Sequence, residues 1–178
     1  MSEKSHLQPL STDHTWEDLV LDAKTRKQVE DIVTWTRHSA PLGGRMGYRC
    51  LFTGPPAQAK ALTAALIGKA SGRPVYRVDL AVVVFKHASD TEQALARVFD
   101  EAARKGAILF FDEADALFGK RGEVKDSHDR YANQEISFLL QRIEKFPGVV
   151  IVASNIAAHI DEAFARRFQS VIIFTGAS

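Results

Sequence analysis

Apolar residues in this chain gather in five short runs, separated by longer segments with a different spacing. The runs cover residues 48–52, 75–79, 107–112, 149–154 and 171–174. Continuous apolar runs of this length are typical of strands covered on both faces, and their alternation with amphipathic segments indicates β-α-β units. The pattern therefore predicts an α/β fold, with a five-stranded parallel sheet flanked by helices.

The segments before and between these runs carry apolar residues at helical spacing. Helices are predicted over about residues 22–38, 60–70, 92–103 and 130–145. The inward face of the first would carry Val29, Ile32, Val33 and Thr36. Each helix would lie with its apolar face on the sheet.

The first 14 residues lack this spacing and are mostly polar. We expect residues 1–14 to form a flexible segment with little structure of its own. Residues 15–178 would then form one α/β domain, because a chain of 178 residues with 46% hydrophobic and 25% charged residues has the size and composition of a single globule.

The charge pattern gives no support for a nucleic acid or a membrane surface as a partner. The 23 basic and 22 acidic residues are interspersed and give a formal net charge of +1, so no nucleic acid is expected. No run approaches the roughly 18 apolar residues of a membrane span, and the N-terminus has no apolar signal region. The one cysteine, Cys50, lies in an apolar run and should be buried and inert. A cytoplasmic location is therefore expected.

Candidate chemistry begins where the central apolar run ends in two adjacent carboxylates, Asp112 and Glu113. Ligands of parallel α/β sheets bind beyond the carboxyl ends of the strands, so both acids should face a cleft. One could hold Mg²⁺ through water while the other polarises the water that attacks a phosphate. The alternative is a strand that ends in solvated acids.

A second candidate segment, residues 54–61, lies between the first predicted strand and the next helix, where a phosphate-binding loop belongs. Such a loop needs a glycine before its lysine and a Ser or Thr after it, and here those positions are Ala59 and Ala61. An alanine forced to positive φ costs about 1 kcal/mol. Lys60 remains as a phosphate-binding charge, and an ordinary strand-to-helix turn is the alternative.

In the order of these segments the chain resembles the AAA+ ATPases, specifically the protein-remodelling branch, whose loop usually reads Gly-Pro-Pro-Gly-Thr-Gly-Lys-Thr. The resemblance implies a P-loop NTPase-type three-layer sandwich and a degenerate Walker A loop. The nucleotide would contact Gly54, Pro55, Pro56, Ala57, Gln58, Ala59, Lys60, Ala61 and Leu62. ATP and Mg²⁺ are the implied cofactors.

The same resemblance assigns roles to the remaining site residues. Residues 110–113 are similar to the Walker B box, which implies Asp112 as the Mg²⁺ partner and Glu113 as the base. Asn155 would be the sensor 1 residue, although it could also be a turn former that ends a strand. Arg166 and Arg167 resemble arginine fingers that reach a neighbouring subunit in a ring, usually a hexamer; their alternative is a solvated helix end.

The resemblance also bears on clients and on the extent of the chain. Lys86 and His87 stand where the family carries a pore loop that grips a polypeptide, so a protein client is possible. The family has a small helical lid after its last strand, and the residues after Phe174 are too few to form one. We therefore expect the lid subdomain to be absent from this chain.

The leading hypothesis is an AAA+ module that binds adenine nucleotide at a subunit interface and drives protein remodelling or threading, with binding and hydrolysis weakened here. The alternative is a catalytically silent AAA+ pseudo-ATPase that acts as a structural or interaction subunit, as Ala57, Ala59 and Ala61 suggest. A small P-loop kinase fits less well, since it has no use for Arg166 and Arg167. DNA-loading AAA+ proteins remain a comparison within the family, but the neutral charge favours protein clients.

Overall fold

A computed structural model describes residues 6–38, 47–83, 88–115, 128–155 and 165–175. The strands are β1 (Gln8–Pro9), β2 (Tyr48–Thr53), β3 (Val75–Asp79), β4 (Ile108–Asp112), β5 (Val149–Ser154) and β6 (Ser170–Ile173). The helices are η1 (Trp16–Asp18), α1 (Ala23–His38), α2 (Ala57–Ser71), α3 (Leu80–Val83), α4 (Ala88–Lys105) and α6 (His128–Lys145). The five expected strands and four expected helices are all present.

The strands form one sheet in the order β1-β3-β4-β5-β2-β6. From β3 to β6 neighbouring strands run parallel, and β1 pairs with β3 in the antiparallel direction. The fold class is therefore confirmed, with a sixth strand that the hydrophobic pattern did not predict. Since the parallel strands run in one direction, their carboxyl ends meet at a single edge of the sheet.

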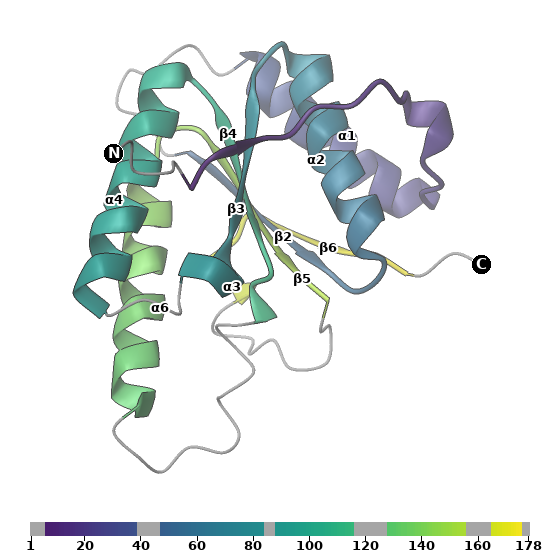
Figure 1. The fold of residues 1–178 in the computed structure, drawn as a ribbon. Coiled ribbons are helices and arrows are strands. Elements are labelled where there is room, and N and C mark those ends of the chain that lie inside the picture. The colour runs from purple at the N-terminus through teal and green to yellow at the C-terminus, as the bar shows by residue number, and fades with distance from the viewer. Residues whose placement is uncertain (1–5, 39–46, 84–87, 116–127, 156–164, 176–178) are drawn as a thin grey trace.

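Helices cover both faces of the sheet, so the molecule has three layers (Figure 1). On one face, α1 and α2 pack on a core that includes Phe52, Phe110 and Ile151. On the other, α4 and α6 pack on Phe111, Val152 and their neighbours. Successive residues of a strand point to opposite faces, which is why Phe110 and Phe111 belong to different cores.

The N-terminal segment departs from the expectation of little structure. Gln8 pairs with Arg77 and Pro9 with Tyr76, and Leu7 is only 7% exposed because it joins the core under α4. This short strand forms because it satisfies the outer edge of β3 and buries an apolar side chain. The expectation was wrong for residues 7–10, whereas the flexibility of residues 1–14 as a unit stays a prediction.

The start of α2 also differs from the sequence prediction. The helix begins at Ala57, three residues before the predicted start at Lys60. Alanine and glutamine are strong helix formers, so these residues extend the helix where glycines would have formed an open loop. The connection between β2 and α2 is therefore only Gly54, Pro55 and Pro56.

Candidate functional site

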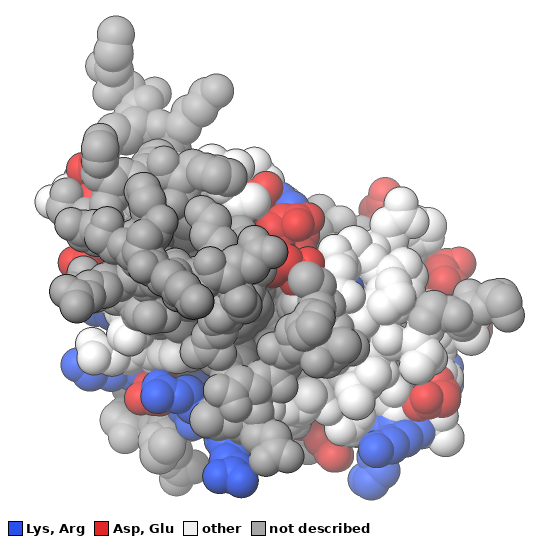
Figure 2. All heavy atoms as spheres, turned by 90° about the horizontal axis from the view of Figure 1, so that it is seen from below, with Lys and Arg blue, Asp and Glu red and all other residues white. Residues whose placement is uncertain are grey.

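The candidate site lies at the edge where the parallel strands end, between β2, β3, β4 and β5 and beside the N-terminus of α2. Figure 2 shows the molecule from below the view of Figure 1, with acidic atoms near the middle of this face and most basic side chains toward its rim. In the sequence, the acids at the strand ends are Asp79, Asp112, Glu113 and Asp115.

Gly54 makes the turn from β2 toward α2. Its φ of +85° lies in the left-handed region, and a Cβ built on it would stand 2.2 Å from the carbonyl oxygen of Phe174. Both the conformation and the close approach require glycine. The residues that follow avoid any such strain: Ala57 and Ala59 lie in α2 and have no positive φ. The predicted cost of an alanine at positive φ is therefore absent, because the segment is helical.

Lys60 points into the site from the first turn of α2 and is only 1% exposed. Its ammonium donates to the carbonyl oxygen of Gly54 and, at 2.6 Å, to Oδ1 of Asn155. Burial lowers the pKa of Lys60, and the nearby carboxylates of Asp112, Asp115 and Glu113 partly oppose that shift. These two acceptors are uncharged, so the ammonium is held by polar atoms of the site itself.

Asp112 ends β4 and binds two donors of this chain. Its Oδ2 accepts from Nε of Arg77 at 2.9 Å, and its Oδ1 accepts from the backbone N–H of Glu113 at 2.8 Å. Asp112 lies beside Asp79 in the β3–β4 register, so the side chains of the two acids leave the same face of the sheet. The carboxylate is therefore already neutralised by a guanidinium from the neighbouring strand.

Glu113 follows with a φ of +60°, a left-handed conformation that a non-glycine residue seldom adopts. Burial, together with Asp112, Asp79 and Asp115, raises the pKa of its carboxyl group. A carboxyl group with a raised pKa accepts a proton more readily near neutral pH. Strained backbone conformations of this kind cluster at functional sites.

Asp115 holds the end of β5. One of its oxygens accepts from the hydroxyl of Ser154, and its carboxylate also accepts from the backbone N–H of Asn155 at 3.1 and 3.3 Å. The backbone N–H of Ala114 donates to the carbonyl of Ala153 at 3.1 Å. The segment after β4 is thereby tied to β5, and the side chain of Asn155 is directed toward Lys60.

Arg166 and Arg167 do not join this cluster. The carbonyl of Arg167 accepts from Nε of Arg49 at 2.8 Å, and its guanidinium pairs with Glu144 at 3.2 Å. Arg49 lies near the start of β2 and Gly54 directly follows the end of that strand, so about 16 Å of extended chain separates them. Both arginines are exposed, at the opposite end of the strands from Lys60. Lys86 and His87 lie outside the described residues.

The residues around Asp112 do not form a magnesium site as they stand. Both oxygens of Asp112 already accept hydrogen bonds, and Ala61 has no hydroxyl. Thr63 does not replace it, because its hydroxyl is buried and donates to the carbonyl of Ala59 at 2.7 Å. Within the described ranges no group of three or more His, Cys, Asp or Glu side chains could hold a metal ion.

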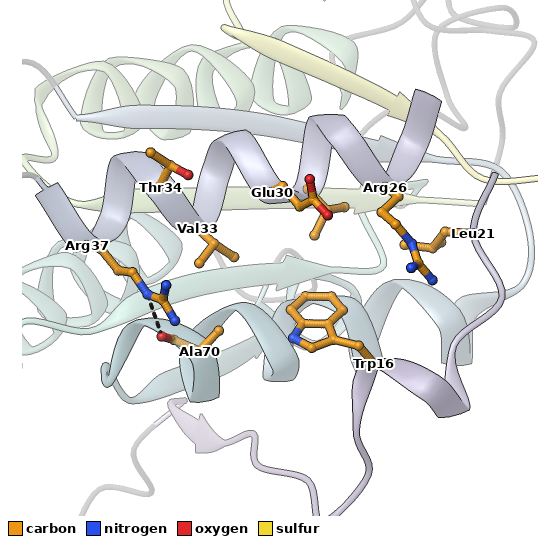
Figure 3. A pocket seen from close by; sticks show the side chains of 9 residues that line it. Trp16, Leu21, Arg26, Glu30, Val33, Thr34, Arg37 and Ala70 are labelled. Atoms are coloured by element: carbon orange, nitrogen blue, oxygen red, sulfur yellow. Dashed lines mark hydrogen bonds between the residues drawn. The ribbon is translucent and has the colours of Figure 1, made fainter. Parts of the chain in front are cut away.

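A separate hollow of about 480 Å³ lies in the groove between α1 and α2 (Figure 3). The indole of Trp16 stands between the two helices, with Arg26 toward one end and Arg37, which donates to the carbonyl of Ala70 at 2.9 Å, toward the other. Ala70 is ten residues from Lys60, or about 15 Å along the helix.

Sequence reasoning missed Arg77, Asp115, Ser154 and Gln8 as parts of the site. Arg77 carried the clearest signal, because it is a charged residue in the middle of a short apolar run. Its partners come from two other strands, so no local spacing could have identified them. None of the helices in the described part of the chain has the length and apolar character that a membrane crossing requires.

Comparison with known proteins supports one family. The model of the family described as "ATPase family associated with various cellular activities (AAA)" matches residues 50–175. The match covers the sheet from Cys50 in β2 to β6, and it includes every side chain described at the strand-end site except Gln8. Members of this family generally use ATP with Mg²⁺ and usually assemble into rings.

Individual relatives agree with this match. An uncharacterised AAA family ATPase, y4kL, of Sinorhizobium fredii is 28% identical over 93% of this chain and 51% of its own length. Cell division protein C of Sulfolobus acidocaldarius is 34% identical over 74% of this chain and 37% of its own. The chain thus spans about half of these relatives or less. The crystal structure of the FIGL-1 AAA domain has the same fold, with a TM-score of 0.68, 22% identity, and 93% and 57% of the two chains covered.

Proposed function

The chain belongs to the AAA family of ATPases, and from this premise we propose that it is a nucleotide-binding module of a ring that remodels or threads other proteins. Its own site would bind adenine nucleotide at a subunit interface, with weakened binding and slow hydrolysis. The observation that carries the proposal is the convergence of Lys60, Asp112, Glu113 and Asn155 at one sheet edge.

Phosphate binding would use the N-terminus of α2 and Lys60. Pro56 is the N-cap and makes no side-chain capping bond, so the first N–H groups of α2 suit an anion. To reach that anion, Lys60 has to exchange the carbonyl of Gly54 and the amide of Asn155 for phosphate oxygens. This exchange costs two hydrogen bonds and weakens nucleotide affinity.

Hydrolysis would depend on Glu113 and Asn155. Glu113 would accept the proton of the attacking water, which its raised pKa favours, and Asn155 would help to position that water. Asp112 orders the backbone of Glu113 by accepting its N–H. No step is assigned to a metal ion, because Asp112 is paired with Arg77 and Ala61 offers no hydroxyl ligand.

Ring formation accounts for the two arginines. Arg166 and Arg167 lie far from their own Lys60, and an arginine can contribute about 10³-fold or more to phosphoryl transfer when it reaches the phosphates of another subunit. We therefore assign them to the neighbouring site of a ring, most simply a hexamer. A protein client would contact Lys86 and His87, and we expect the module to act in the cytoplasm without nucleic acid or a membrane.

Calorimetric titration with ATP, with and without Mg²⁺, tests this proposal. We expect a dissociation constant weaker than about 10 μM for the natural chain. A variant with glycine at 57 and 59 and threonine at 58 and 61 should bind at least about tenfold more tightly, because an open loop would replace the first helical turn. Adding Lys60→Met to that variant should abolish the gain; an unchanged affinity would show that Lys60 does not bind phosphate.

The second candidate function is a silent structural subunit. The observation in its favour is that Lys60 already has two acceptors and a buried position without nucleotide. Absence of ATP binding by both the natural chain and the variant with the restored loop, together with retained self-association in analytical ultracentrifugation, would favour this candidate. Binding by the natural chain at about 1 μM or tighter would exclude it.

A further inference from the structure

Arg77 was not predicted as a site residue, and its guanidinium contacts three side chains. Nε donates to Oδ2 of Asp112 at 2.9 Å, one terminal nitrogen donates to Oε1 of Gln8 at 3.3 Å, and the other lies 3.8 Å from Oδ2 of Asp79. The side chain of Arg77 is 25% exposed and that of Asp112 is 13% exposed. Hydrogen bonds between charged groups with limited access to water are among the strong ones in proteins.

The backbone dictates this placement. Arg77 and Asp79 are two residues apart on β3, so both side chains leave the same face of the sheet. Asp112 lies directly beside Asp79 in the parallel register, and Gln8 lies opposite Arg77 in the antiparallel one. Val75 and Phe110, on the same face, pack in the core beneath α1 and α2. Arg77 is thus held on the side of the sheet from which Lys60 enters the site.

We propose that Arg77 acts as a built-in cation for Asp112: its guanidinium neutralises the carboxylate that would otherwise hold a hydrated divalent metal, so that the site binds the phosphates of a nucleotide without such a metal. The part of this inference that concerns phosphates rests on the proposed function. The part that concerns Asp112 does not.

A guanidinium and a magnesium ion differ in chemistry, which explains why replacing the ion by Arg77 at Asp112 matters. Arginine is protonated at every accessible pH and presents donors in a fixed plane, which suits a carboxylate. It cannot coordinate phosphate oxygens and water together, as a magnesium ion does. Arg77 therefore offsets one of the two negative charges of Asp112 and Asp79, while Lys60 and the N-terminus of α2 remain to attract phosphates.

Titration with Mn²⁺ alone, followed by the electron paramagnetic resonance signal of the free ion, tests the exchange without nucleotide. The natural chain should show no site, whereas Arg77→Met, which frees the carboxylates of Asp112 and Asp79, should bind one ion weakly, with a dissociation constant of about 10⁻³ M. Adding Asp112→Asn to Arg77→Met should remove that site. Arg77→Lys keeps a positive charge and should still exclude the ion. Equal Mn²⁺ binding by the natural chain and Arg77→Met, or no binding by either, would overturn the proposal.

Arg142→Met is the matched control for loss of an arginine. Arg142 pairs with Asp100 at 2.9 Å and is 31% exposed, between α4 and α6 and away from the strand ends. It should acquire no Mn²⁺ site. Thermal melting identifies folded variants, and Arg77→Gln replaces Arg77→Met if the latter does not fold.

A second measurement uses only the natural chain. Titration with ATP in EDTA and in Mg²⁺ should give affinities within about threefold of each other, against tenfold or more for a metal-dependent site. Tighter binding in Mg²⁺ by tenfold would overturn the proposal even with the Mn²⁺ result in its favour. No binding under either condition would contradict the proposed function instead, and the Mn²⁺ titrations would then decide the role of Arg77 at Asp112.

Discussion

The two sides of the candidate site differ in how they depart from an open nucleotide site. On the α2 side, a helical turn from Ala57 to Lys60 stands where a phosphate-binding loop was expected. On the side of β4 and β5, the carboxylates of Asp112 and Asp115 each accept hydrogen bonds from groups of this chain. One side is a helical turn without a side-chain cap, whereas the other holds these acids in hydrogen bonds within the chain.

This difference shows that the acids have a structural role apart from nucleotide. Asp112 pairs β4 with β3 through Arg77, and Asp115 fixes the end of β5 through Ser154 and Asn155.

The largest expected effect concerns the turn that both sides share. Gly54→Ala should lower the free energy of unfolding by about 3 kcal/mol, because the added Cβ meets the carbonyl of Phe174 at a φ that already disfavours alanine. Gly72→Ala is the matched control: its φ is +69° and no atom lies within 4 Å of the added Cβ, so about 1 kcal/mol is expected. Urea unfolding measures both, and equal losses would contradict the close approach at Gly54.

The next effect tests the pairing on the acidic side. Asp112→Ala should cost about 2 kcal/mol, because it leaves Nε of Arg77 without its carboxylate. The double variant Asp112→Ala with Arg77→Met should lose less free energy of unfolding than the two single variants together, by at least about 1 kcal/mol, since both partners are then absent. Additive losses in the double-mutant cycle would mean that the two side chains do not interact.

A smaller effect is expected at Asp115. Asp115→Asn should lower the free energy of unfolding by about 1 kcal/mol, because an uncharged amide accepts more weakly from Ser154 and its NH₂ group would face the backbone N–H of Asn155. Asp100→Asn, at a side chain that is 73% exposed and paired with Arg142, should cost less than about 0.5 kcal/mol. A cost at Asp115 no greater than that at Asp100 would remove the structural role of this acid.

The smallest effect depends on pH. Because the pKa of Glu113 is raised above its ordinary value of 4.5, the folded state holds this proton more tightly than the unfolded state does. The contribution of Glu113 to stability is therefore full below pH 4.5 and is lost as the pH rises through the folded pKa. Glu113→Gln should match the natural chain at pH 4 and exceed it by up to about 0.5 kcal/mol at pH 7. Equal stability at both pH values would contradict the raised pKa.

Much of the fold could be predicted because its signals are local. The five apolar runs became β2 to β6, and Val29, Ile32 and Thr36 are buried on the inner face of α1. The start of α2 was predicted three residues too late, because residues 54–61 were assigned to a phosphate-binding loop. The helix propensity of Ala57, Gln58 and Ala59 favours a helical turn there instead. Strand β1 was not predicted, because a strand of two residues is too short to show an alternation of apolar and polar positions.

The site was predictable only in part, for a different reason. Lys60 and Asn155 are 95 residues apart, and a family pattern placed both at one edge, where they form a hydrogen bond. The pairing of Arg77 with Asp112 depends on the lateral register of β3 and β4, which no spacing along the chain encodes. The roles of Glu113, Asn155, Arg166 and Arg167 remain predictions.

The short first strand has a consequence for solubility. An outer strand with unpaired N–H and C=O groups is a template on which another chain can add a strand. On the β3 side that position is taken by Gln8 and Pro9, and proline has no N–H to offer a newcomer. On the other side, the carbonyl of Val171 in β6 already accepts from the side chain of Gln28 at 3.3 Å. The β3 border is thus a poor starting point for strand-by-strand aggregation, and the β6 border is covered at Val171.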